Sequence, residues 1–114
     1  MDEEIMTPDR IKFTYKGKEY TLEFDRAAVA KAERTYGIDL TQMTTAKLTL
    51  MQDLFAAAFI KHHQKVKRSL INEIFYSMDE KVELYQMLVA MYSNVANSVL
   101  EDSEEGNGTS WTTE

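Results

Sequence analysis

The fold is decided by residues 11–24, which read Ile11-Lys-Phe-Thr-Tyr-Lys-Gly-Lys-Glu-Tyr-Thr-Leu-Glu-Phe24. Apolar and polar residues alternate on both sides of Gly17, with the period of two that is expected for strands with one buried face. A glycine between two such runs is typical of a hairpin turn. The stretch therefore predicts an antiparallel β-hairpin. Its apolar face carries Ile11, Phe13, Tyr15, Tyr20, Leu22 and Phe24.

The register of this hairpin depends on which two residues form the turn. A type II′ turn at Gly17-Lys18, with glycine first because φ is positive there, places Tyr15 opposite Tyr20. A turn at Lys16-Gly17 is the alternative. The first register is the one we expect, because it forms two favourable cross-strand ion pairs that the alternative loses. These pairs are Lys16 with Glu19 and Lys12 with Glu23.

Helices must cover the hairpin, because an isolated hairpin is not stable in water. Asp25 is a good N-cap for a first helix that ends near Tyr36, with Gly37 as the left-handed residue after it. We expect three further helices: from Thr44 or Thr45 to His62, from Ser69 to Met78, and from Glu80 to Leu100 with Asp79 as the cap. No Gly or Pro lies between His62 and Arg68, so the alternative that the second and third helices are continuous stays open. The face of the second helix that we expect to be buried consists of Leu48, Met51, Phe55, Ala58 and Phe59.

These elements predict an α+β fold that is mostly helical: an N-terminal antiparallel hairpin followed by about four helices. With 114 residues and no cysteine, the chain is long enough to bury one core without disulfides or metals. We expect a flexible N-terminus at residues 1–9, a single domain at residues 10–100, and a disordered acidic tail at residues 101–114.

The net charge of −6 is concentrated in that tail, which has five acidic residues and no basic one. The other 100 residues are close to neutral, with 14 acidic and 13 basic side chains. Such a charge distribution does not favour nucleic acid as a partner. The acidic start is unlike a signal peptide and no apolar run has the length of a membrane span, so we expect no membrane association and a cytoplasmic location.

The sequence has no recognisable catalytic or cofactor motif, so we expect a non-catalytic binding protein without a cofactor. His62 and His63 are adjacent and would point about 100° apart on a helix, so they do not predict a metal site. A histidine favoured by a helix C-terminus is the ordinary explanation. A basic cluster surrounds them, and it is either a solvated loop or a patch for an acidic partner, including the chain's own tail. Its members are Lys61, Lys65, Lys67 and Arg68.

The last helix suggests where a partner binds. One broad apolar face suits the domain core, and it consists of Tyr85, Leu88, Tyr92, Val95, Ala96 and Val99. A second stripe of Leu84, Met87 and Met91 lies beside it, which makes the apolar arc wider than a surface helix normally needs. Either the helix is central and buries both stripes, or the second stripe binds a partner or another copy of the chain. Methionine suits adaptable binding surfaces. Trp111 in the polar tail is a further candidate anchor.

A family resemblance adds a possible partner. Residues 11–33, which begin Ile11-Lys-Phe-Thr-Tyr-Lys-Gly and end Val29-Ala-Lys-Ala-Glu33, resemble small tail-module proteins of phages and prophages of Gram-positive bacteria, known as tail assembly chaperones. The likeness continues in Leu54-Phe-Ala-Ala-Ala-Phe-Ile-Lys-His-His63 and covers about residues 10–100. The shared motifs are structural and not catalytic.

The resemblance implies that the protein binds the long, apolar, helical tape measure protein and keeps it soluble in the host bacterial cytoplasm. It also implies that the protein helps to recruit tail tube subunits and is absent from the mature virion. Such families often make a longer form by ribosomal frameshifting near the end of the short gene. In this sequence residues 101–114 lie where that junction would fall. Two alternatives remain open: a structural phage component, such as a head–tail connector or minor tail protein, and a small regulatory or adaptor protein.

Overall fold

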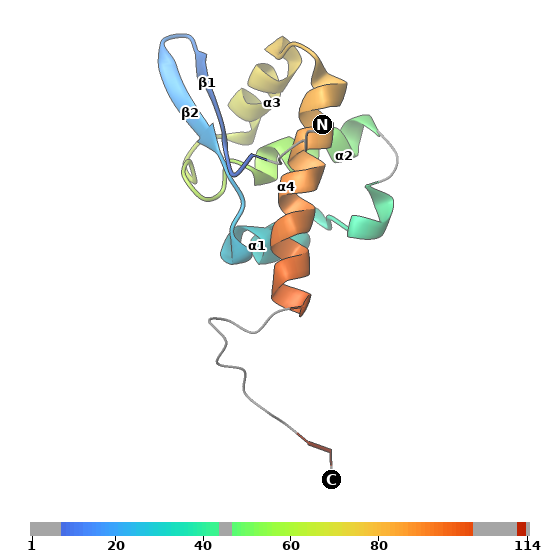
Figure 1. The fold of residues 1–114 in the computed structure, drawn as a ribbon. Helices are drawn as coiled ribbons and strands as arrows, with labels where there is room; N and C mark the ends of the chain where they lie inside the picture. Colours follow the sequence, from blue (N-terminus) through green and yellow to red (C-terminus); the bar gives the residue numbers. More distant parts are fainter. Residues whose placement is uncertain (1–7, 44–46, 102–111, 114) are drawn as a thin grey trace, which may run out of the picture.

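A computed structural model of the chain describes residues 8–43, 47–101 and 112–113. It confirms the predicted fold class, an N-terminal antiparallel hairpin followed by four helices (Figure 1). The proposed flexible N-terminus and acidic tail lie mostly outside the described residues. The elements are β1 (Ile11–Tyr15), β2 (Lys18–Leu22), α1 (Arg26–Tyr36), the short 3-10 helix η1 (Leu40–Gln42), α2 (Leu48–Ala57), α3 (Arg68–Ser77) and α4 (Lys81–Glu101).

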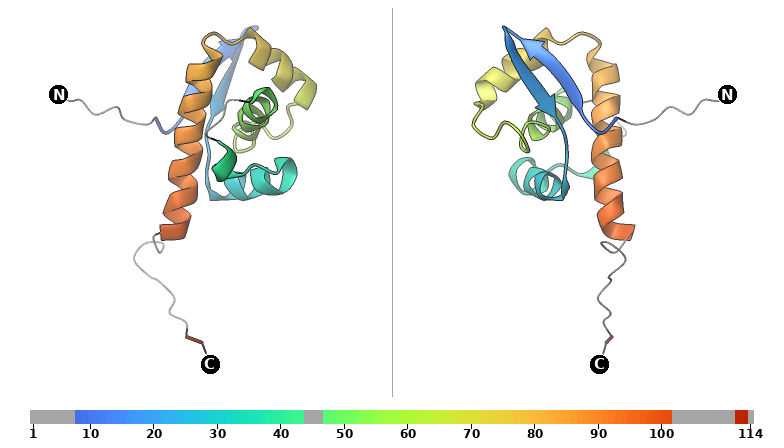
Figure 2. Two further views of the ribbon diagram at one scale, coloured as in Figure 1. Left: turned by 90° about the vertical axis from the view of Figure 1, so that its right-hand side faces the viewer. Right: turned by 60° about the vertical axis from the view of Figure 1, so that its left-hand side comes forward.

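Helix α2 is the central element, because it packs against α1, α3 and α4. Helix α4 runs along one side of the domain, with the hairpin and α3 beside its first half and α1 beside its second half (Figure 2). The largest side chains with almost no exposed surface come from the hairpin and from α2, α3 and α4. They are Tyr92, Phe55, Phe59, Phe75, Leu22, Leu54, Ile74 and Leu88.

The hairpin is held against α2 by aromatic side chains. The Phe13 ring lies 6.4 Å from Phe55 and 6.5 Å from Phe59, measured between ring centroids. Tyr20 lies 5.7 Å from Phe59, and Phe55 lies 5.5 Å from Phe75 of α3. These distances are in the range where aromatic pairs attract one another beyond the effect of their buried area. The cluster therefore supplies the cover that a two-stranded hairpin requires.

The predicted register of the hairpin is wrong by two residues. The turn is formed by Lys16 and Gly17, so Tyr15 lies opposite Lys18 and Phe13 lies opposite Tyr20. Both turn residues have positive φ, 49° and 82°, which is typical of a type I′ turn. The twist of that turn matches the twist of the strands. Exposed ion pairs contribute too little to oppose this preference. A shift of two leaves every side chain on its predicted face.

Replacing Lys16 by asparagine is expected to stabilise the protein by roughly 0.5–1 kcal/mol, because asparagine tolerates the left-handed conformation better than lysine does. The ion pair lost, from Lys16 Nζ to Glu73 Oε2 at 3.2 Å, contributes little because the two side chains are 74% and 51% exposed. Chemical denaturation checks this result. Lys16→Val is the opposing variant, and it should lower the midpoint. Equal midpoints for the wild-type chain and the two variants would contradict the turn geometry.

The first helix has the predicted boundaries. Asp25 Oδ1 accepts a hydrogen bond from the Ala28 amide at 2.8 Å, as an N-cap does. At the other end, Gly37 has φ 66° and its amide donates to the Glu33 carbonyl. Here the local signals in the sequence were sufficient to define both ends.

The second and third helices are separate. Helix α2 ends at Ala57 and α3 begins at Arg68, although no Gly or Pro lies between them. Two tertiary hydrogen bonds join the intervening loop, residues 58–67, to the outer edge of β2 and to the residue directly after it. The Glu23 amide donates to the Ala58 carbonyl at 3.2 Å, and the Thr21 amide donates to His63 Nε2 at 2.9 Å. These bonds satisfy strand amides that a continuous helix would leave without a partner.

Two predictions at helix starts are corrected. Helix α4 begins at Lys81, and the Glu80 carbonyl accepts from the Leu84 amide at 3.0 Å. Glu80, with φ 53°, therefore occupies the cap position that was predicted for Asp79. Helix α2 begins at Leu48, whose side chain is 53% exposed and does not belong to the buried stripe. The start predicted at Thr44 or Thr45 lies outside the described residues.

Candidate functional site

The predicted partner stripe on α4 does not form one exposed face. Met87 is 40% exposed, Leu84 is half-buried against the core, and Met91 is only 4% exposed. Met91 is covered because the segment before β1 and the end of the hairpin approach this side of α4. There they enclose a small pocket of about 170 Å³ lined in part by Arg10, Phe24 and Met91. This burial corrects the expectation for Met91. Trp111 lies outside the described residues.

The core face of α4 largely follows the prediction. Tyr85, Leu88, Tyr92 and Ala96 are buried, and Val95 is half-buried. Val99 is 47% exposed because the last turns of α4 extend beyond α1 (Figure 1). The broad apolar arc therefore serves two purposes in this fold: most of it forms the core, and part of it remains at the surface.

Large apolar side chains are exposed at three further places on the helices. Leu48 begins α2 and is 53% exposed, Tyr76 near the end of α3 is 58% exposed, and Val82 at the start of α4 is 55% exposed. The Tyr76 hydroxyl accepts a hydrogen bond from Gln52 Nε2 at 2.6 Å, and Gln52 lies one turn after Leu48 on the same side of α2. Leu48 and Tyr76 thus share one surface. With Val82 and Met87 they form what we call the exposed apolar set.

Helical periodicity alone did not identify this set. Leu48 belongs to the apolar stripe of α2, and only its position at the first residue of the helix leaves it uncovered. Tyr76 and Val82 lie on either side of the connection between α3 and α4. The sequence signal for such exposure is an apolar residue at the end of a helix, next to the point where the chain changes direction. Single exposed apolar residues are common in proteins. The exposed apolar set is a candidate binding site because its members lie on three adjoining helices.

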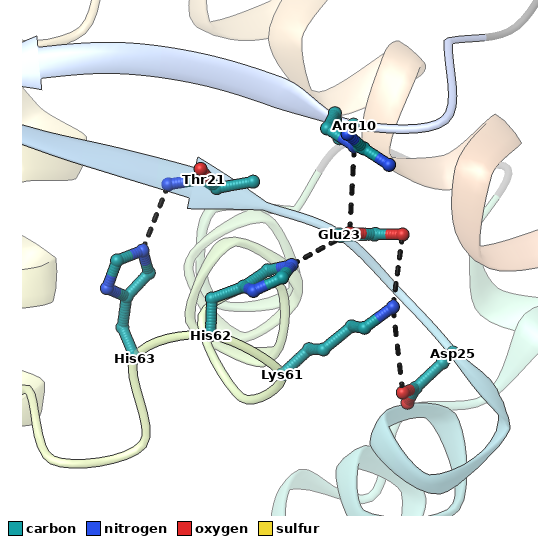
Figure 3. Close-up of polar contacts among 7 residues, drawn as sticks. All are labelled: Arg10, Thr21, Glu23, Asp25, Lys61, His62 and His63. Carbon is teal, nitrogen blue, oxygen red and sulfur yellow. Dashed lines mark hydrogen bonds and ion pairs between the residues drawn. The ribbon is translucent and has the colours of Figure 1, made fainter.

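A polar cluster centred on Glu23 joins the segment before β1, the end of β2 and the loop of residues 58–67 (Figure 3). The Glu23 side chain is 15% exposed, and its carboxylate lies 3.1 Å from Lys61 Nζ, 2.8 Å from His62 Nε2 and 3.8 Å from Arg10 Nε. The hydrogen bond from His62, followed by that from Lys61, lowers the pKa of Glu23 below its ordinary value. This carboxylate, held by Arg10, Lys61 and His62, joins the three chain segments.

His63 closes the edge of the sheet. Its Nε2 accepts from the Thr21 amide, and its ring centroid lies 5.1 Å from that of Tyr20. Burial, followed by the nearby charges of His62 and Lys18, lowers the pKa of His63 below 6.5. The expectation of histidines at a helix C-terminus is wrong, because α2 ends at Ala57 and both histidines belong to the loop.

Stability is expected to fall as the pH decreases from about 6.5, and His63 is expected to cause part of this loss. Above that pH His63 is neutral in both states and the bond from Thr21 is in place. Below it the unfolded chain takes up a proton first, because the folded-state pKa is lower; the contribution is lost as the pH falls through the folded pKa. Denaturation midpoints at pH 7.5, 6.5 and 5.5 measure this. His63→Gln retains an acceptor but does not titrate, so it should weaken the pH dependence; an unaltered dependence would exclude His63.

Within the described residues, no group of three or more His, Asp or Glu side chains is placed to hold a metal ion. No helix there is both long and apolar enough to cross a membrane. A further pocket at the junction of α1, α3 and the loop of residues 58–67 is small, about 100 Å³.

The fold and its surfaces define a small hairpin-plus-helices domain with apolar side chains exposed on adjoining helices. Residues 6–114 match the family described as Domain of unknown function (DUF5055), and the chain belongs to that family. No curated protein and no solved structure matches the chain.

Proposed function

We propose that the protein is a non-catalytic tail assembly chaperone of a tailed phage or prophage, which binds apolar helical segments of the tape measure protein. The observation that carries the proposal is the exposed apolar set. Leu48, Tyr76 and Val82 are each more than half exposed, and Met87 is 40% exposed. Exposed apolar side chains on adjoining helices can bury the apolar face of a partner helix.

The chemistry of the exposed apolar set suits a client that presents many similar helical segments. Met87 is flexible and polarisable, so it can adapt to different partners. Tyr76 combines a large ring with a hydroxyl that already bonds to Gln52, so binding at the ring does not require a buried unsatisfied hydroxyl. The acidic sequence after α4 keeps the net charge away from zero, which favours solubility while apolar surface is exposed.

The identity of the client rests on the resemblance in sequence. The resembling segments form the hairpin, most of α1, the last turn of α2 and the beginning of the loop after it, so they support a related fold and not a particular contact. On this proposal the protein acts in the host bacterial cytoplasm, also assists tail tube subunits, and is absent from the mature virion.

Co-expression with the tape measure protein tests the proposal. The wild-type chain should raise the soluble fraction of the tape measure protein several-fold, and Leu48→Glu with Val82→Glu should remove most of this gain. Both positions lie in the first turn of a helix, where an acidic side chain is favourable, so this double variant should fold. Asn97→Glu with Val99→Glu adds the same charge at the far end of α4 and should retain the gain.

Each outcome is decisive. If the wild-type chain does not change the solubility of the tape measure protein, the chaperone proposal fails. If both double variants lose the gain equally, the exposed apolar set is not the binding surface. Recovery of the protein in purified virions would support a structural component, such as a connector or minor tail protein.

A further inference from the structure

A cationic pocket lies where the loop of residues 58–67 passes the start of β2. It is open, has a volume of about 400 Å³, and no acidic side chain lines it. Its polar lining consists of Lys18, Lys61, His62, His63, Gln64 and Lys65. A site with this charge and these donors is suited to carboxylates.

The polar side chains of this pocket differ in their partners. Lys61 and His62 turn toward Glu23 and bind its carboxylate (Figure 3). Lys18 lies 5.4 Å from the centroid of the Tyr20 ring and has no carboxylate partner among the described residues. Lys65 likewise has none in the part of the chain that the structure describes. These two side chains therefore remain available to an incoming anion.

His63 adds a neutral donor. Its Nε2 accepts from the Thr21 amide, so in the neutral ring the proton must reside on Nδ1. The described residues provide no acceptor for that Nδ1–H. The bond to the strand therefore fixes which nitrogen can donate, and a carboxylate in the pocket is a suitable acceptor.

We infer that this pocket binds the chain's own acidic C-terminal segment, whose sequence is Asp102-Ser-Glu-Glu-Gly-Asn-Gly-Thr-Ser-Trp-Thr-Thr-Glu114. The argument is charge complementarity within one molecule. The segment has four acidic residues and no basic one, whereas the pocket has three lysines and no acidic residue. Carboxylates of the segment pair with Lys18 and Lys65, and the inference stands independently of the proposed function.

The connection is long enough. The Tyr92 ring of α4 lies 5.1 Å from the Phe24 ring, and Phe24 directly follows Glu23, whose carboxylate contacts Lys61 and His62 of the pocket. From Tyr92 to the end of α4 at Glu101 the helix rises about 14 Å. The 13 residues that follow span up to about 45 Å when extended. The segment can therefore return along α4 and reach the pocket of its own chain.

Paramagnetic relaxation measures this contact directly. The chain contains no cysteine, so a spin label on Ser110→Cys, close to the end of the acidic segment, is the only label in the full-length protein. At low salt the label should broaden the amide signals of residues 61–66 and leave those of α3 near Tyr76 unaffected. Raising the salt to about 1 M should abolish the broadening, because the screening length falls to roughly 3 Å.

Charge-reversal variants identify the binding residues. Lys18→Glu with Lys65→Glu should eliminate the broadening at the pocket, whereas Lys12→Glu with Lys47→Glu, an equal charge change at exposed lysines elsewhere, should preserve it. Absence of broadening in the unmodified pocket, or equal loss in both double variants, overturns the inference. Mixing spin-labelled chains with isotope-labelled, spin-free chains tests the source: broadening in that mixture would assign the segment to a second copy and overturn binding within one chain.

Discussion

Met91→Asp is expected to destabilise the protein by about 3–5 kcal/mol, whereas Met87→Asp should leave it folded. The two methionines are one turn apart on α4, yet Met91 is 4% exposed and Met87 is 40% exposed. Replacing Met91 removes its packing and places a carboxylate near Glu23, which also lines the adjoining pocket. The charge at Met87 remains in water, where it has little effect on folding.

Thermal and chemical denaturation of the two variants measure this difference. Since small domains are stable by about 5–15 kcal/mol, Met91→Asp should lower the midpoint greatly or prevent cooperative folding. Equal stability of the two variants would mean that Met91 is accessible in solution, and the Leu84, Met87 and Met91 stripe would then be restored as a partner surface. Measuring whether the Met87→Asp variant still binds the partner then tests whether Met87 is part of the binding surface.

Phe55→Ala is expected to cost about 3–5 kcal/mol, because it leaves a cavity where four elements meet. The Phe55 side chain has no exposed surface, and its ring lies 5.2 Å from Phe59 and 5.5 Å from Phe75. It also contacts Phe13 of the hairpin at 6.4 Å, so its loss weakens the attachment of β1 and β2 to α2. The denaturation midpoint should decrease greatly at an unchanged slope.

Tyr76→Ala is the matched control, since it also truncates an aromatic residue to alanine. Its side chain is 58% exposed, so the change should cost no more than about 1 kcal/mol even though the hydrogen bond from Gln52 is lost. Similar losses in the two variants would contradict the placement of Phe55 at the centre of the core.

Local signals in the sequence were sufficient where the determinants are local. Alternation around Gly17 predicted the hairpin and its buried face, and Asp25 and Gly37 predicted both ends of α1. The register failed because ion pairs were weighed above the turn geometry of Lys16 and Gly17. Both registers bury the same face, so the hydrophobic pattern did not distinguish them.

Features that depend on distant parts of the chain were not predictable in this way. The end of α2 depends on hydrogen bonds to β2, which lies more than 30 residues earlier. The burial of Met91 depends on the segment before β1 and on the end of the hairpin. The exposed positions of Tyr76 and Val82 depend on how α3 and α4 meet. In each case a helix was predicted, but its end or its surroundings were not.

The bond from the Thr21 amide to His63 also bears on aggregation. An unpaired strand edge is a template on which another chain can add a strand, and proteins commonly cover such edges. Here a single titratable ring and the Ala58 carbonyl cover the outer edge of β2. A protonated His63 ring cannot accept that bond, so acid strong enough to protonate His63 in the folded domain removes one of the two bonds that cover this edge. Self-association through β2 is therefore a hazard that this protein meets first at acidic pH, and His63→Gln is the substitution that reduces it.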